Sequence, residues 1–124
     1  YMRGVFEQGL PWIELEVVGN SEKPTKVDVI VDTGFNGYLT LPYATAFPIG
    51  FTLEGVGSGK VADGSFSPYL IGSGTVLFGT KRIRTTVDIQ PNCRPLLGTE
   101  LLKEMGCTLR VDPIKGIVEL IEVR

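Results

Sequence analysis

Apolar and polar residues alternate along much of this chain, in short runs that glycine, proline and other turn-forming residues separate. The clearest run is Trp12–Val18, where apolar residues take every second position and two glutamates lie between them. Short runs at such close spacing are typical of an all-β sandwich or barrel. The expected strands are Arg3–Glu7, Trp12–Val18, Lys26–Val31, Tyr38–Leu41, two arms of a hairpin within Phe51–Ile71, Thr75–Phe78, Arg82–Ile89, Cys107–Val111 and Ile117–Val123. We therefore expect one all-β domain over residues 1–124.

Only one segment carries a good helix pattern. In Thr99–Met105 the apolar residues share one face, Thr99 can act as N-cap, and Gly106 can end the helix. A single further helical turn is expected at Pro42–Phe47, with Pro48 ending it.

The composition narrows the chemistry more than it narrows the fold. The net charge is −2 and the basic residues form no stripe, which argues against a nucleic-acid partner. No apolar run reaches membrane-spanning length and the first residues lack a signal-peptide pattern, so we expect no membrane partner. The two cysteines, Cys93 and Cys107, are expected to be buried reduced thiols, which favours a cytoplasmic protein. The absence of histidine excludes Ser-His-Asp catalysis, Cys-His catalysis and histidine-ligated zinc. We expect neither a metal nor another cofactor.

The strongest candidate for chemistry is Asp32, within the tripeptide Asp32-Thr33-Gly34. Most other acids lie in polar loops or on solvent-facing positions of strands, whereas Asp32 directly follows the apolar pair Ile30-Val31. A carboxylate there is expected to be partly desolvated and held by neighbouring backbone amides. Taken alone, the tripeptide is equally consistent with an aspartate that caps a strand-to-turn junction.

A second candidate region is the glycine-rich hairpin within Phe51–Ile71. Gly55, Gly57 and Gly59 alternate with larger residues, and glycine inside a strand weakens it and allows close backbone approach. We expect this hairpin to be more mobile than its neighbours. The alternative is an ordinary surface hairpin.

These parts, in this order, resemble the retroviral-type (retropepsin-like) aspartic peptidases. The family pattern has two apolar residues before Asp-Thr-Gly, a strand, a glycine-rich flap hairpin, and an apolar-apolar-Gly segment before a short helix. The matching segments are Ile30–Gly34, Tyr38–Leu41, Gly55–Ile71 and Leu96–Gly98 before Thr99–Met105, and the likeness covers about residues 12–111. The resemblance implies the retroviral-type closed β-barrel with one short helix in its C-terminal half.

The same resemblance implies an activity. Because the chain has a single Asp-Thr-Gly, an aspartic endopeptidase of this kind must be a homodimer in which each protomer contributes Asp32. The paired carboxylates share one proton, activate a water and hydrolyse a peptide or protein substrate. Thr33 then locks the two loops together, Gly34 leaves room for the substrate backbone, and a flap at about Gly55–Ser65 closes over the peptide. The residues implied to contact substrate are Phe35, Asn36, Val56, Gly57, Val61 and Leu96.

The sequence also departs from the retroviral pattern. Phe35, Asn36 and Thr99 stand where retroviral enzymes usually have alanine, an acid and an arginine. The tail from Asp112 to Arg124 is longer than a retroviral C-terminus and is expected to form an extra hairpin. The alternative function is a non-catalytic dimeric β-barrel that binds peptide strands or serves as an interaction module. Thr33 and Gly34 would have the same structural roles with or without catalysis.

Overall fold

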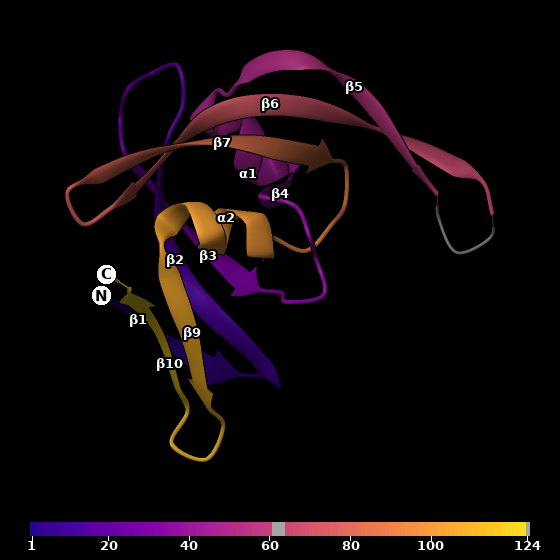
Figure 1. The fold of residues 1–124 in the computed structure, drawn as a ribbon. Coiled ribbons are helices and arrows are strands. Elements are labelled where there is room, and N and C mark those ends of the chain that lie inside the picture. Colours follow the sequence, from indigo (N-terminus) through magenta and orange to yellow (C-terminus); the bar gives the residue numbers. More distant parts are fainter. Residues whose placement is uncertain (61–63, 124) are drawn as a thin grey trace.

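The computed structural model describes residues 1–60 and 64–123, which form ten strands and two short helices (Figure 1). The strands are β1 Met2–Glu7, β2 Leu10–Val18, β3 Thr25–Val31, β4 Leu39–Pro42, β5 Thr52–Lys60, β6 Phe66–Phe78, β7 Lys81–Gln90, β8 Leu96–Leu97, β9 Cys107–Asp112 and β10 Ile117–Glu122. The helices are α1 Tyr43–Ile49 and α2 Thr99–Met105. None of the helices within the described ranges is long and apolar enough to cross a membrane.

The strands close into a ring around one hydrophobic core. Their order is β6-β7-β4-β8-β3-β2, and β2 also pairs with β6, which completes the ring. The alternation predicted for the second strand is confirmed, because Ile13, Leu15 and Val17 are at most 1% exposed. That strand begins at Leu10 rather than Trp12, because Gln8 and Gly9 adopt positive φ angles of 54° and 75° and return the chain directly into the ladder.

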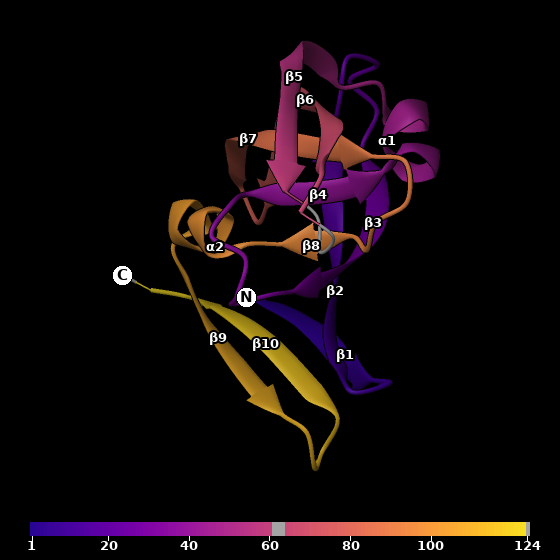
Figure 2. The ribbon, with the colours of Figure 1, turned by 90° about the vertical axis from the view of Figure 1, so that its right-hand side faces the viewer.

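Two arms leave the ring in different directions (Figures 1 and 2). One is the hairpin of β5 and β6, in which β5 pairs with β6 alone among the described strands. The other is a sheet of β1, β10 and β9 that continues from β2, and it contains the C-terminal hairpin expected from the sequence. The turn of that hairpin is held by Asp112, whose Oδ1 accepts hydrogen bonds from the backbone N–H groups of Ile114 and Lys115 at 3.1 and 3.0 Å.

The prediction of a separate strand at Thr75–Phe78 is wrong, because β6 runs unbroken through Gly72 and Gly74. The side chain of Phe51 occupies the space beside both glycines, so that a Cβ on Gly74 would lie 2.6 Å from Phe51 Cδ1. The glycines therefore admit a core aromatic residue rather than break the strand. This continuity lets one strand pair with β5 at its start and with β2 at its end.

The helix predicted at Thr99–Met105 is confirmed, and so is its end at Gly106, which has a left-handed φ of 68°. The structure also contains α1 at the position where the sequence predicts a single helical turn. Pro48 lies inside α1 rather than ending it, and the helix ends at Ile49, followed by the C-cap Gly50 with a left-handed φ of 75°. The missing proline N–H removes one hydrogen bond from the last turn, and the stacked rings of Tyr43 and Phe47, 4.7 Å apart, pack along this helix.

Candidate active site

Asp32 lies where β3 leaves the ring, and its backbone still belongs to the ladder with β8. The N–H of Ile30 donates to the carbonyl of Pro95 at 2.8 Å, and the N–H of Asp32 donates to the carbonyl of Leu97 at 2.9 Å. The strand alternation therefore continues through Asp32, which shares the face of Ile30, while Val31 faces the core and is 4% exposed. A buried strand thus delivers the carboxylate, as the sequence predicts.

The Asp32 carboxylate is half-buried, and a local hydrogen bond orients it. Its Oδ1 accepts the backbone N–H of Gly34 at 2.9 Å, and its backbone carbonyl accepts the N–H of Phe35 at 3.1 Å. A Cβ on Gly34 would lie 3.2 Å from that same Oδ1, so glycine permits this tight turn. Thr33 and Gly34 are exposed beside it. The loop therefore presents the carboxylate at the surface of the chain with one oxygen held in a hydrogen bond.

The loop is braced from behind by the start of α2. The N–H groups of Gly98, Thr99 and Glu100 donate to the carbonyls of Tyr38, Phe35 and Gly37 at 2.9, 2.9 and 3.1 Å, respectively. The first N–H groups of a helix have no partner within the helix, so the aspartate loop satisfies them. The predicted side-chain cap by Thr99 is wrong. Gly98 holds the N-cap position and the Thr99 hydroxyl donates to the Phe35 carbonyl at 3.4 Å.

Phe35 packs against its own loop. A Cβ on Gly37 would lie 2.5 Å from two carbons of the Phe35 ring, and a Cβ on Gly98 would lie 2.8 Å from Cδ2 of that ring. The Gly98 Cβ would also lie 2.2 Å from the Gly37 carbonyl oxygen. Phe35 is half-buried in this packing, so it supports the loop whether or not it also contacts a substrate.

The other sequence-predicted substrate contacts fall into two groups. Asn36 is exposed on the loop, and Leu96 is half-buried in β8, where it pairs with Ile30 on the face that carries Asp32. Val56 and Gly57 lie on β5, away from the loop along the chain, and Val56 is 68% exposed. Val61 lies outside the described residues. Figure 2 shows the β5–β6 hairpin passing in front of β7 and reaching β4.

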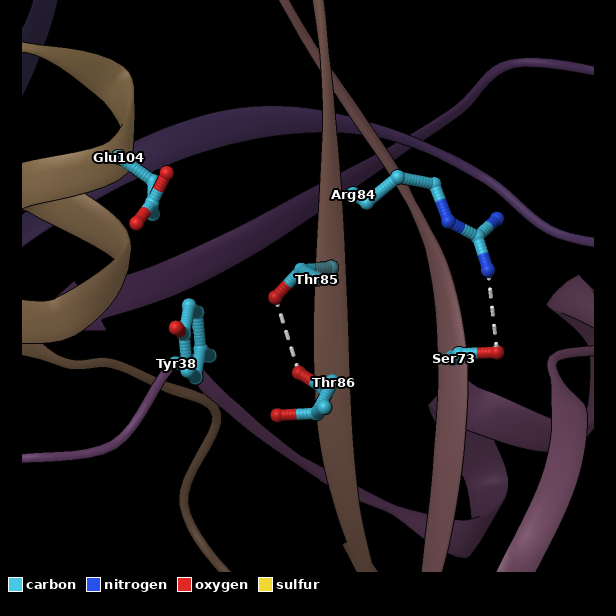
Figure 3. Close-up of a pocket in the computed structure, with 6 residues that line it drawn as sticks. All are labelled: Tyr38, Ser73, Arg84, Thr85, Thr86 and Glu104. Atoms are coloured by element: carbon cyan, nitrogen blue, oxygen red, sulfur yellow. Dashed lines mark hydrogen bonds between the residues drawn. The ribbon is translucent and has the colours of Figure 1, made fainter.

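Cavities between the described residues lie away from Asp32. One has a volume of about 390 Å³ and is lined by Tyr38, Ser73, Arg84, Thr85, Thr86 and Glu104 (Figure 3). Asp32 does not line this cavity or the three others of about 240 to 270 Å³. Among residues 1–60 and 64–123 no three acids or cysteines gather closely enough to hold a metal ion. Asp32 is therefore a partly exposed carboxylate beside the exposed residues Thr33 and Gly34.

One acid that sequence reasoning passed over is Asp88 in β7. Alternation places it opposite the core residues Val87 and Ile89, which marks it as an outward-facing position. In the structure it is half-buried, and that burial raises the pKa of its carboxyl. No local sequence signal distinguishes it from the exposed Thr86 on the same face, because its burial depends on neighbouring strands.

This ring of strands, with a short helix behind its Asp-Thr-Gly loop, is the fold of a retroviral protease, which confirms the predicted fold class. The chain is similar to the solved structure of the EIAV protease complexed with the inhibitor HBY-793. The TM-score is 0.65 at 18% sequence identity, over 85% of this chain and 96% of the other. No protein-family model matches the chain. No curated protein matches it either.

Proposed function

We propose that this chain is one half of an aspartic endopeptidase, active as a C2 homodimer with one Asp32 from each protomer. The observation that carries the proposal is the presentation of Asp32. Its carboxylate is half-buried at the end of a core strand, on a loop whose backbone hydrogen-bonds to β8 and α2. Preorganised groups of this kind are what acid–base catalysis requires, because misplacement of a reacting group lowers the rate.

The homodimer follows from the chemistry. The mechanism needs two carboxylates, and the sequence supplies one Asp-Thr-Gly. Asp32 is partly exposed with Thr33 exposed beside it, so a second copy can bring its own loop against the first about a two-fold axis. The Thr33 hydroxyls then hydrogen-bond across that axis and hold the two loops in register.

Two facing carboxylates at about 3 Å share one proton, because both cannot be ionised at that separation. The ionised Asp32 takes a proton from a water between them, and the protonated Asp32 donates to the oxygen of the scissile carbonyl. The water oxygen bonds to the carbonyl carbon and gives a tetrahedral diol. The diol collapses when a proton reaches the leaving nitrogen and the carbon–nitrogen bond breaks, so no covalent enzyme intermediate forms.

The substrate in this proposal is an extended peptide that lies across the Asp32 face beneath the β5–β6 hairpin. Such a peptide binds through main-chain hydrogen bonds, and side-chain pockets supply the specificity. Asn36 offers a polar contact from the loop, and Leu96 an apolar one from β8. Val56 and Gly57 contribute from the hairpin, which acts as the flap, and Phe35 contributes at the margin of the loop.

A second candidate is a non-catalytic dimeric module that binds peptide strands. The bracing of the loop favours it, because the backbone bonds between Phe35, Gly37 and the start of α2 hold the loop in place without regard to catalysis. The two functions share the dimer and the bound peptide. They differ only in whether the paired carboxylates turn over a peptide.

The test combines solution mass with peptide cleavage. Wild type, Asp32→Asn and the control Asp28→Asn, an exposed residue of the same strand, are compared on a library of unstructured peptides at acidic to neutral pH. We expect dimers throughout, cleavage by wild type and Asp28→Asn, blockage by a statine-type inhibitor, and a loss of roughly 10³-fold or more in Asp32→Asn. Circular dichroism checks that the fold is retained. A dimer that binds peptides without cleaving them supports the module, and a monomer that cleaves them refutes the paired mechanism.

A further inference from the structure

A row of paired residues crosses the ring on the face that carries Asp32. Ile30 pairs with Leu96, Leu96 with Thr40, and Thr40 with Asp88. Residues that pair across neighbouring strands project from the same face of a sheet. Asp32 follows Ile30 by two residues in the same ladder, so Asp88 projects from the face that presents Asp32.

Asp88 is the charged member of this row. Ile30 and Thr40 are 4% and 5% exposed, and Leu96 and Asp88 are half-buried. Within the described part of the chain the Asp88 carboxylate has neither a hydrogen-bond partner nor an ion-pair partner. Arg84, on the same face of β7, instead donates a hydrogen bond to Ser73 at 3.4 Å.

A partly desolvated carboxylate without a cation is unfavourable, and burial raises the pKa of Asp88 accordingly. The free energy of such a group falls when a cation approaches from outside the protein. Asp88 is therefore better suited to bind a positive charge than to support the fold, because a structural role would leave it with a partner.

The position of Asp88 matches the reach of a bound peptide. Three strand spacings of about 4.8 Å separate it from Ile30, roughly 14 Å along the sheet. An extended peptide rises about 3.3 Å per residue, so about four peptide residues span the distance between Ile30, two residues before Asp32, and Asp88. Asp88 also pairs with Ile71 of β6, at the base of the hairpin that passes in front of this face (Figure 2).

We propose that Asp88 is a specificity-determining residue that selects peptides with a lysine or arginine within about four residues of the cleaved bond. The proposal rests on the proposed peptidase function and adds to it the charge of the preferred substrate. In a C2 dimer each protomer supplies one Asp88, so the preference applies on both sides of the scissile bond.

The test uses peptide pairs that are identical except for lysine or norleucine, placed in turn at each position within four residues of the cleaved bond. The kcat/KM of each peptide is measured for wild type, Asp88→Asn and the control Asp28→Asn. In wild type and Asp28→Asn we expect lysine to be preferred by about tenfold or more at one position or more, because a charge-assisted hydrogen bond forms. In Asp88→Asn the preference falls to within about twofold, while the norleucine peptides are cleaved as before.

Each other outcome has a distinct meaning. Equal cleavage of lysine and norleucine peptides by wild type overturns the role of Asp88 and leaves the peptidase intact. The same conclusion follows if Asp88→Asn keeps the preference, or if it slows every peptide equally, as a purely structural residue would. If wild type cleaves no peptide, the peptidase itself is refuted and the substrate preference with it.

Discussion

The aspartate loop and the β5–β6 hairpin are both rich in glycine, but the surroundings of those glycines differ. In the loop, glycines lie where other atoms leave no room, and a Cβ on Gly98 would lie 2.2 Å from the Gly37 carbonyl oxygen. In the hairpin, a Cβ on Gly55 would meet nothing within 4 Å, and the neighbouring Val56 is 68% exposed. The hairpin is not open throughout, because a Cβ on Gly57 would lie 2.5 Å from Cζ of Tyr69. The loop therefore uses glycine for close packing, whereas the hairpin combines close packing at Gly57 with open space at Gly55.

The largest expected difference in stability is between two leucine-to-alanine variants, one behind the aspartate loop and one on the hairpin. Leu97 is 0% exposed behind the loop and Leu53 is 60% exposed on the hairpin. We expect Leu97→Ala to lower the free energy of unfolding by about 3 kcal/mol or more, because it leaves a cavity in the core. Leu53→Ala should change it by no more than about 0.5 kcal/mol. Urea denaturation measures both changes. Equal losses of stability would contradict the difference in side-chain packing between the loop and the hairpin.

The next effect comes from adding a methyl group. Gly98→Ala forces the Gly37 carbonyl to move, and that carbonyl accepts the N–H of Glu100 at 3.1 Å. We expect a loss of about 2 to 3 kcal/mol in the free energy of unfolding. The matched variant Gly55→Ala on the hairpin should stay within about 0.5 kcal/mol of wild type, since the added carbon meets open space. A well-tolerated Gly98→Ala would contradict the proposed bracing of the loop.

A smaller effect is expected between Phe35 and Gly37. Gly37→Ala places a carbon 2.5 Å from the Phe35 ring, and Phe35→Leu removes part of that ring. In a double-mutant cycle we expect a coupling of about 1 kcal/mol, with the double variant more stable than the two single effects add up to. Thermal or urea unfolding of the four proteins gives this number. Strict additivity would place the ring elsewhere than against Gly37.

The smallest expected effect is a pH dependence at Asp88, in the strand that joins the two regions. Burial raises the pKa of its carboxyl above the ordinary value of 3.8, so the folded protein holds this proton more tightly than the unfolded chain. The stability from this group is fully present below that value and is lost as the pH rises through the raised pKa. Asp88→Asn should therefore lose less stability than wild type as the pH rises from 3.8, as urea unfolding at successive pH values can measure. If the free energy of unfolding changed with pH in the same way in both proteins, the burial of Asp88 would be contradicted.

The sequence by itself determined the local features of this protein. Alternation identified the core face of β2, and the apolar run before Asp32 identified a buried strand that ends in an acid. The helix Thr99–Met105 and its glycine end followed from periodicity and from the one residue type that adopts a left-handed φ without strain. Each of these depends on residues close together in the chain, which is why a pattern can reveal them.

The tertiary structure alone decided the contacts between distant segments. The closing pair between β2 and β6 and the continuity of β6 past Gly72 depend on Phe51 and on strand register, for which the glycines give no sign. The carbonyls of the Asp32 loop accept the first N–H groups of α2 across about sixty residues of sequence. A local pattern therefore pointed to Thr99 as the cap and could not reveal the distant carbonyls. The burial of Asp88 likewise comes from neighbouring strands. Backbone hydrogen bonds carry no side-chain signature, and only the folded chain shows which of them form.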